Sequence, residues 1–312
     1  MPSRAGSRSA ISSTRCRSAK TRPARPPAAP DPAAPSYYRP RSLEEALEVM
    51  VQRTGEVRAV AGGTDLLVEA LEGRVDRGSL FDLSLVPDLQ GIEETEDHVR
   101  IGSAVTHAAI VDSPLVERWC PGLPVACAGI GGPQIRNRGT LGGNLAKGSS
   151  FADTIPPLLA ADAVVQVVSV SDRRDVPLAE FLVGPGQTAL APDELILGVT
   201  LPKRPGVRGV FLRLGQRQGP SVSKVSIAVG MTFKDGRPDW VRVALGGVAP
   251  TAMRARDTEA ALMGGGYDAL KRAMEAIRKE VRPEDDLRST ADYRRAMCPV
   301  LLERAIRRIT EG

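Results

Sequence analysis

The chain has 312 residues, of which 42% are hydrophobic and 25% are charged, as in a globular protein long enough for two domains. It contains no run approaching about 18 apolar residues, so a membrane-spanning helix is not expected. Residues 1–36 contain seven basic side chains and one Asp, a net charge of +6, and the formal net charge of the whole chain is +5. The other residues therefore sum to −1, so a general polyanion-binding surface is not implied.

Residues 1–36 are rich in Ser, Arg, Pro and Ala and contain almost no large apolar side chain. Such a segment cannot bury a core, and we expect it to be a disordered extension. It has neither an apolar h-region nor a twin arginine, so a secretory signal is not expected. A misassigned start or a dispensable tail is the simplest interpretation, and an Arg- and Ser-rich targeting segment is the alternative.

The first predicted elements are short helices that alternate with short strands. Ser42, with Glu45 three residues later, forms a capping-box pattern that predicts an amphipathic helix. A strand at residues 57–61 is expected to break at Gly62-Gly63 and to run into the next helix. Further strands are expected at residues 79–84 and 98–105, followed by two short helices capped by Thr106 and Ser113.

Prolines and glycines limit the helices between residues 120 and 139 to a turn or two. Beyond them we expect, in chain order, a helix at 154–163, strands at 164–170, 174–178 and 194–202, a linker at 203–209, strands at 211–215, 225–233 and 240–250, and helices at 251–263, 268–281 and 290–309. Pro299 should kink or restart the last helix. The pattern predicts an α+β protein that ends in a second α/β domain.

The four cysteines, Cys16, Cys120, Cys127 and Cys298, form no CxxC pair, and the chain has only two histidines. A protein-bound zinc or iron–sulfur site is therefore not expected. Reduced thiols and a cytoplasmic location are the simplest interpretation.

Two glycine pairs raise the question of a bound group. They lie in "AVAGGTDLL" at residues 59–67 and in "RNRGTLGGNLAKGSSFAD" at residues 136–153. Either pair alone is most simply a turn or a helix cap. Together they would offer backbone N–H groups and two hydroxyls, and glycine allows a diphosphate to approach the backbone. Neither a P-loop nor a GxGxxG fingerprint is present, so we expect a dinucleotide bound by two separate loops.

Four segments carry a family resemblance: "AGGTDLL", "IRNRGTLGGNLA" with the downstream Asp153, "DELILGVTLP" and "DYRRAMCPVLLERAI". They resemble the FAD-binding medium subunit of molybdenum-containing hydroxylases, the carbon monoxide dehydrogenase and xanthine dehydrogenase family. The resemblance implies a p-cresol methylhydroxylase-type FAD-binding domain of two α+β subdomains, followed by a smaller α/β C-terminal domain of the carbon monoxide dehydrogenase flavoprotein type. We expect these domains at residues 37–203 and 208–312.

The resemblance also implies which residues hold FAD. The first loop, whose backbone would bind the diphosphate, comprises Ala61, Gly62, Gly63, Thr64, Asp65 and Leu66. The second comprises Thr140, Gly142, Gly143 and Asn144. Asp153 would accept hydrogen bonds from FAD, Ile130 and Ile196 would provide apolar contacts, the latter near the isoalloxazine, and Arg213 would lie near the flavin. Neither loop contains His or Cys, so non-covalent binding is expected.

The function that the resemblance implies is electron transfer, without a catalytic side chain or a metal ligand in this chain. Electrons would pass from [2Fe–2S] clusters on a small partner subunit through FAD to an external acceptor. Molybdenum–pterin would lie on a large partner subunit, in a dimer of heterotrimers, and no nucleic-acid partner is expected.

Two alternatives stay open at this point. One is a free-standing FAD-dependent oxidase or dehydrogenase of the same fold, which the scarcity of His and Tyr disfavours, since such an enzyme needs an acid or base beside the flavin. The other is a non-catalytic scaffold, which would have no use for intact glycine loops.

A few features remain outside this scheme. The chain has no Cys-containing insertion of the kind found in relatives that act on 4-hydroxybenzoyl-CoA, and the segment "FLRLGQRQGPSVSK" has no aromatic residue after Phe211 to screen the flavin. His107 follows a strand end and could approach the flavin, although a helix-start position is the simpler interpretation. The arginines of the last helix could face a partner, although a solvated face is the simpler interpretation for Arg294, Arg295, Arg304, Arg307 and Arg308.

Overall fold

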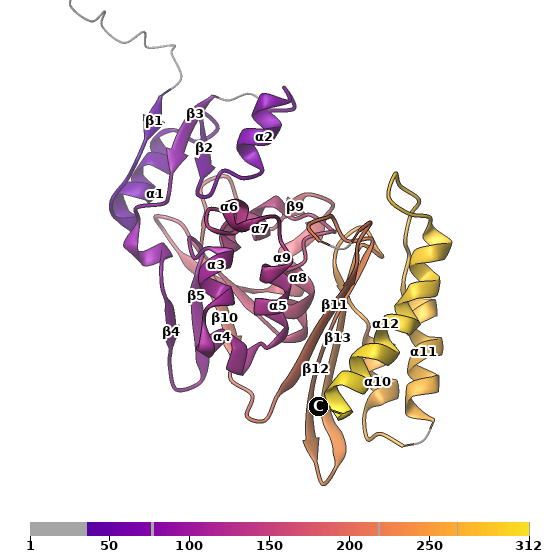
Figure 1. Ribbon diagram of the computed structural model, residues 1–312. Helices are drawn as coiled ribbons and strands as arrows, with labels where there is room; N and C mark the ends of the chain where they lie inside the picture. The colour runs from indigo at the N-terminus through magenta and orange to yellow at the C-terminus, as the bar shows by residue number, and fades with distance from the viewer. Residues whose placement is uncertain (1–35, 76–77, 218, 267, 312) are drawn as a thin grey trace, which may run out of the picture. The chain divides into compact units, whose positions relative to one another are not determined.

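The computed structural model describes residues 36–75, 78–217, 219–266 and 268–311. Within these residues the strands form sheets of three, five, four and two members, and helices cover the three larger sheets (Figure 1). The α+β class expected from the sequence is confirmed. The expected extension lies, apart from Ser36, outside the described residues.

The N-terminal subdomain is a parallel sheet in the order β1-β3-β2 with two helices. Its elements are β1 (Tyr37–Tyr38), α1 (Leu43–Gln52), β2 (Val57–Val60), α2 (Leu66–Leu71) and β3 (Ser79–Asp82). The Ser42 hydroxyl caps α1 by accepting a hydrogen bond from the Glu45 N–H at 3.2 Å, as the capping-box pattern predicts. The apolar face of α1, with Leu43 and Leu47, packs in one core with Phe81 of β3. By contrast, α2 buries none of its residues.

The second subdomain is a five-stranded antiparallel sheet in the order β4-β5-β10-β6-β7. After the 3₁₀ turn Pro87–Leu89, its strands are β4 (Ile92–Glu94), β5 (His98–Gly102), β6 (Val164–Val168), β7 (Arg173–Pro177) and β10 (Leu195–Pro202). Short helices follow β5 and β7, namely α3 (His107–Val111), α4 (Pro114–Trp119), α5 (Gly122–Ala128), α6 (Pro133–Arg136), α7 (Leu141–Lys147), α8 (Ile155–Ala160) and α9 (Leu178–Phe181). The pair β8 (Leu182–Gly184) and β9 (Gln187–Thr188) precedes β10. Valines of the sheet and leucines of α5, α7 and α8 share one core.

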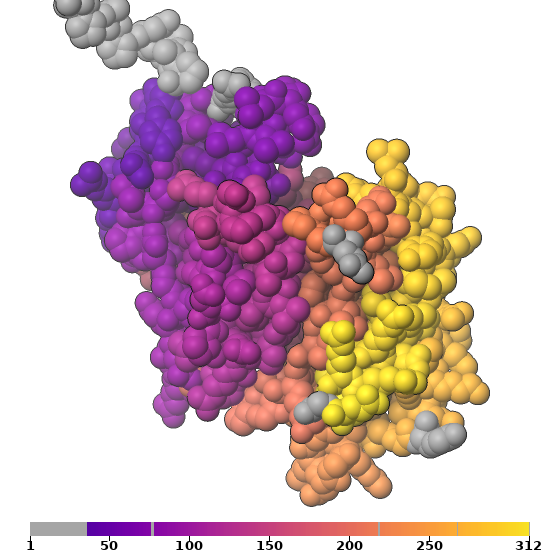
Figure 2. All heavy atoms as spheres, in the orientation of Figure 1, coloured from indigo at the N-terminus to yellow at the C-terminus, as the bar shows by residue number. Residues whose placement is uncertain are grey.

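The C-terminal sheet is antiparallel, in the order β11-β12-β13-β14, and carries three helices. Its elements are β11 (Arg208–Leu214), β12 (Val225–Lys234), β13 (Arg237–Gly246), β14 (Met253–Arg254), α10 (Arg256–Leu262), α11 (Ala269–Glu280) and α12 (Ala291–Glu311). The space-filling view shows these helices packed directly against the sheet (Figure 2).

Both faces of β12 are buried, and its side chains explain how. Ile227 and Val229 belong to the core shared with the C-terminal helices, whereas the intervening Ala228 belongs to the core of the second subdomain. Small residues on this second face allow α8 to approach, since a Cβ on Gly230 would lie only 3.1 Å from the Ala160 carbonyl oxygen. The alternation of large and small residues therefore joins the C-terminal sheet to the second subdomain.

Two details differ from the sequence-based expectation. The helix expected from residue 251 begins only at Arg256, because Met253–Arg254 pairs with β13 as a strand. Pro299 does not restart the last helix, which runs unbroken as α12. No helix in the described ranges has the length and hydropathy needed to cross a membrane, as expected.

Asp162, in the turn after α8, is the centre of an ion-pair network that ties this turn to the C-terminal sheet. Its carboxylate accepts hydrogen bonds from Arg242 Nε at 2.9 and 3.0 Å and from Arg254 Nη1 at 2.7 Å, and Arg204 Nη2 lies at 3.7 Å. The backbone of Asp162 is left-handed, with φ 53°, which Asp and Asn tolerate better than most residues.

Asp162→Asn should lower the free energy of unfolding by about 1–3 kcal/mol, because it keeps the shape and removes the charge that holds three arginines together. Urea unfolding measures this. Asp235→Asn is the matched control, since Asp235 has the same φ of 53° but is exposed, and no ion pair is found for it among the described residues. Equal effects of the two changes would contradict a role for the network.

Candidate functional site

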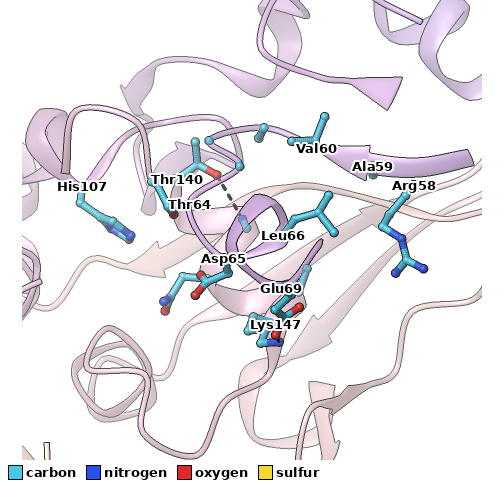
Figure 3. Close-up of a pocket in the computed structure, with 17 residues that line it drawn as sticks. Arg58, Ala59, Val60, Thr64, Asp65, Leu66, Glu69, His107, Thr140 and Lys147 are labelled. Atoms are coloured by element: carbon cyan, nitrogen blue, oxygen red, sulfur yellow. Dashed lines mark hydrogen bonds and ion pairs between the residues drawn. The ribbon is translucent and has the colours of Figure 1, made fainter. Parts of the chain in front are cut away.

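A cleft lies between the segment that follows β2 and helix α7. It contains two hollows, a polar one of about 240 Å³ and an apolar one of about 130 Å³. The hollows adjoin each other at Ala59, Val60, Ala61, Gly143 and Ala146, which line both. Figure 3 shows the polar hollow, with residues of β2, α2, α3 and α7 around it.

The segment from Gly62 to Asp65 lines the polar hollow. Gly63 has φ +71°, a left-handed conformation that glycine adopts without strain. Within the described residues, no acceptor is found for the N–H groups of Gly62, Gly63, Thr64 and Asp65. Four consecutive N–H groups without internal partners require water or a ligand as acceptor.

The second glycine pair lies in the first turn of α7. Thr140 is the N-cap, and its hydroxyl accepts the Gly143 N–H at 3.2 Å. The Gly142 N–H donates to the Ser103 carbonyl at 2.8 Å, and the Asn144 N–H donates to the Thr140 carbonyl at 3.0 Å. These backbone donors are therefore already used, because the helix and its cap satisfy them.

Gly62, Gly142 and Gly143 each occupy a position where a side chain would interfere, for a different reason at each position. A Cβ on Gly62 would lie 2.0 Å from the Arg138 carbonyl oxygen, so this glycine permits close contact between the two segments. A Cβ on Gly142 would lie 2.5 Å from Ser103 Cβ, so this glycine permits α7 to pack on the end of β5. At Gly143 the nearest atom is only the Thr140 hydroxyl, at 3.0 Å, and this glycine lines both hollows.

The charged side chains around the polar hollow largely cancel. Arg58 and Lys147 line it together with Asp65 and Glu69. The Lys147 ammonium is paired with the Glu69 carboxylate, and this hydrogen bond is the largest of the influences that together lower the pKa of Glu69. An anion in the polar hollow would therefore be bound mainly by the backbone N–H groups of the first loop.

A second cluster, formed by Asp153, Arg213 and Ser223, lies at the junction with the C-terminal domain. Asp153 is 7% exposed, and burial raises the pKa of its carboxyl, against hydrogen bonds from Ser223 and Arg213 that lower it. Ser223 Oγ donates to Asp153 Oδ1 at 2.7 Å, and Arg213 Nη1 donates to Oδ2 at 3.2 Å. The cluster joins the two domains through a charge-assisted hydrogen bond.

His107, the first residue of α3, also lines the polar hollow although it is only 3% exposed. Its N–H donates to the Gly139 carbonyl at 2.9 Å, and its ring Nδ1 lies 3.7 Å from Cys127 Sγ. Burial lowers the pKa of His107 from its ordinary value of 6.5 to about 4, so the imidazole is neutral at pH 7.

Two family models together match most of the chain. Residues 32–204 match the FAD-binding domain in molybdopterin dehydrogenase, and residues 211–309 match the carbon monoxide dehydrogenase flavoprotein C-terminal domain. The chain belongs to the family of FAD-binding medium subunits of molybdenum hydroxylases. The resemblance noted in the sequence is thereby confirmed, and the assignment favours neither a free-standing oxidase nor a scaffold.

Named members of this medium-subunit family are similar over nearly their whole length. The nicotine 6-hydroxylase medium subunit of Paenarthrobacter nicotinovorans is 36% identical over 86% of this chain and 95% of its own. The carbon monoxide dehydrogenase medium chain of Hydrogenophaga pseudoflava is 30% identical over 86% and 95%. Among solved structures, carbon monoxide dehydrogenase from Hydrogenophaga pseudoflava matches with a TM-score of 0.84 and 32% identity, covering 88% of this chain and 96% of that one.

The structure brings most of the residues that we predicted to bind FAD to one cleft. Nine of the predicted residues line the polar hollow, namely Ala61, Gly62, Gly63, Thr64, Asp65, Leu66, Thr140, Gly143 and Asn144. Two further predicted residues, Gly142 and Ile196, line the apolar hollow. Asp153, Arg213 and Ile130 line neither hollow. Arg213 nevertheless lies beside the segment that carries Ile130, since a Cβ on Gly129 would be 3.2 Å from its Nε.

Several lining residues were not predicted from the sequence. Lys147 and Glu69 are separated by 78 positions, so their pairing follows only from the fold. Gly139 has room for no side chain, because a Cβ there would lie 3.0 Å from the His107 ring. For His107 the signal was its position directly after a strand end, where functional side chains often lie, and we had favoured a simple helix-start role. Among the described residues, no group of His, Cys, Asp and Glu is arranged to hold a metal.

The lowered pKa of His107 predicts that the free energy of unfolding depends on pH. The unfolded chain binds a proton at His107 more tightly than the folded chain does. The contribution of the neutral imidazole to the free energy of unfolding is therefore complete above pH 6.5 and is lost as the pH falls towards about 4. The loss should approach roughly 3 kcal/mol, since one pKa unit corresponds to about 1.4 kcal/mol. Urea unfolding of FAD-free protein at a series of pH values measures it.

His107→Gln supplies the reference for this measurement, because glutamine does not titrate. Acidic groups such as Asp286, whose pKa is lowered to about 2, contribute equally to both proteins and cancel. Parallel stability curves for the two proteins between pH 6.5 and 4 would contradict a buried neutral His107.

Proposed function

We propose that this chain binds FAD non-covalently in the cleft and transfers electrons between an iron–sulfur partner subunit and an external acceptor. FAD, when bound, supplies the chemistry that connects one-electron donors with a two-electron acceptor. The observation that carries the proposal is the row of four unpaired N–H groups from Gly62 to Asp65, which faces a hollow left open by Gly143.

The polar hollow fits a diphosphate. Its donors are backbone N–H dipoles, which neutralise phosphate charge without a flexible cation, and Lys147 is already paired with Glu69. Thr140 caps α7 and so fixes Gly143 at the border of the two hollows. In this proposal the first loop binds the diphosphate, and the second segment shapes the cleft instead of donating its own N–H groups.

The two ring systems of FAD would lie at different ends. The apolar hollow with Ile196 suits the adenine, because it is lined mainly by aliphatic side chains. Asp153, Arg213 and Ile130 belong to the opposite end, reached from Asn144 through the Thr154 hydroxyl, which donates to Asn144 Oδ1 at 2.5 Å. We propose the isoalloxazine there, which moves Ile196 from the flavin end, where we first expected it, to the adenine end.

The partners we propose are a large subunit with molybdenum–pterin and a small subunit with two [2Fe–2S] clusters, assembled as a dimer of heterotrimers. Support comes from relatives that are named medium subunits or medium chains. We propose a cytoplasmic location, in keeping with three cysteines, Cys120, Cys127 and Cys298, that are free and buried. The functional division at residues 37–203 and 208–312 is part of the same proposal.

The first test is cofactor content. The chain purified alone and with its co-expressed partners should show a flavin absorption spectrum, and acid should release FAD. Iron–sulfur absorption should appear only in the complex. A chain that stays colourless in both preparations and takes up no added FAD would overturn the proposal.

Gly143→Val should weaken FAD binding by at least about tenfold, because it places a branched side chain at the border of the two hollows. Fluorescence titration with FAD measures the affinity, and thermal unfolding shows that the variant is folded. Gly142→Ala is the control for packing: its Cβ would meet Ser103, so it should lower the melting temperature even without FAD. Full FAD affinity in folded Gly143→Val would contradict the assignment of the cleft.

Substitutions of Asp153 and Arg213 should shift the midpoint potential of bound FAD in opposite directions. Arg213→Ala removes a positive charge and should lower the midpoint potential of bound FAD, whereas Asp153→Asn leaves Arg213 uncompensated and should raise it. Each shift should be on the order of tens of millivolts, measured by redox titration at mildly alkaline pH, where Asp153 stays ionised. Arg217→Ala, an exposed change in the loop that follows β11, is the control. Unchanged potentials in both variants would remove this pair from the flavin site.

A further inference from the structure

His107 is the one buried imidazole that lines the proposed diphosphate site, among the residues the structure describes. In Figure 3 its ring extends from the start of α3 towards the part of the polar hollow bounded by Thr64 and Thr140. The strand end before it is fixed by pairing with the second glycine segment, since Thr106 forms a bridge with Thr140 and the Leu141 N–H donates to the Val105 carbonyl. The ring is therefore held by the same contacts that build the cleft.

One ring nitrogen has a partner inside the protein. Nδ1 lies 3.7 Å from Sγ of Cys127 on α5. Burial raises the pKa of the Cys127 thiol, so the sulfur keeps its proton at neutral pH and can donate it to Nδ1. The imidazole is itself neutral, so its single proton then lies on Nε2.

The other ring nitrogen has no acceptor among the described residues, although the ring is buried. Nε2 lies beside Gly139, where an added Cβ would be 3.3 Å away. Gly139 thus leaves space for the ring, and the Nε2–H group opens to the polar hollow. Because the rest of the ring is buried, this N–H group can reach only an acceptor inside the hollow, which is a bound group or water.

The charged groups that line the same hollow do not replace this donor. Lys147 is paired with Glu69, Asp65 is an acceptor, and Arg58 projects from β2 at a separate place in Figure 3. A neutral N–H group therefore complements the backbone N–H groups of the first loop without adding charge.

We propose that His107 is an FAD-binding residue, with Nε2–H donating to a diphosphate oxygen and Cys127 fixing the tautomer. The inference rests on the proposed function and adds a side-chain donor to a site that otherwise depends on backbone N–H groups. It assigns a binding role to the residue that sequence analysis treated as a helix start.

The test separates the two ring nitrogens by substitution. In His107→Gln the side-chain amide reaches the position of Nε2 and keeps a donor there, whereas in His107→Asn the shorter amide reaches only the position of Nδ1. FAD affinity of the full chain is measured by quenching of flavin fluorescence. Asn should bind FAD about tenfold or more weakly, as expected for a lost hydrogen bond to a charged group, and Gln should stay within about threefold of the unchanged protein.

Two spectra report on the contact independently of affinity. The ³¹P resonances of bound FAD should shift in His107→Asn and much less in His107→Gln. The ring ¹⁵N shifts of His107 should report a proton on Nε2, and Cys127→Ala should shift that tautomer balance. A thermal unfolding curve for each variant shows that it is folded.

The outcomes distinguish a failure of the His107 assignment from a failure of FAD binding by the chain. If Gln and Asn variants both bind FAD like the unchanged protein, His107 is only a packing residue and this inference is wrong, while the proposed function stands. If His107→Gln loses as much affinity as His107→Asn, a donor at Nε2 is not what FAD requires, and the inference also fails. If the unchanged protein binds no FAD, the proposed function itself fails.

Discussion

The cleft depends on the close approach of two backbone segments at Gly62. Its α-carbon faces the Arg138 carbonyl oxygen so closely that any Cβ would lie 2.0 Å from it. This contact joins the parallel sheet of the first subdomain to the segment that leads into α7, far along the chain. Because the contact excludes every side chain, the residue there must be glycine whether or not a cofactor is bound.

The two segments that meet at this contact have different tasks. In the first, the residues from Gly62 to Asp65 line the polar hollow, and no internal acceptor is found for their N–H groups among the described residues. In the second, the N–H groups of Gly142 and Gly143 are used by Ser103 and Thr140. The two similar glycine pairs therefore differ in structure: the first leaves its N–H groups without internal acceptors, and the second begins a helix.

The C-terminal domain meets the second subdomain through charged groups. Asp162 ties the turn after α8 to Arg242 and Arg254 of the C-terminal sheet, and the small residues of β12 allow α8 to pack on its other face. The Asp153–Arg213 pair crosses the same junction. The position of Arg213 relative to the cleft is therefore fixed by packing between domains, and a change at this junction would affect stability.

The sequence by itself determined the α+β class and most elements, because capping boxes and alternating strands are local patterns, and its glycine pairs marked the two segments that line the cleft. Tertiary structure alone decided that Gly142 and Gly143 begin a helix, that Lys147 pairs with Glu69, and that Asp153 is held by Arg213 and Ser223. It also decided that the His107 ring is buried beside Gly139 and Cys127. These features depend on residues distant in sequence meeting in space, and no local pattern records which partner a side chain will find.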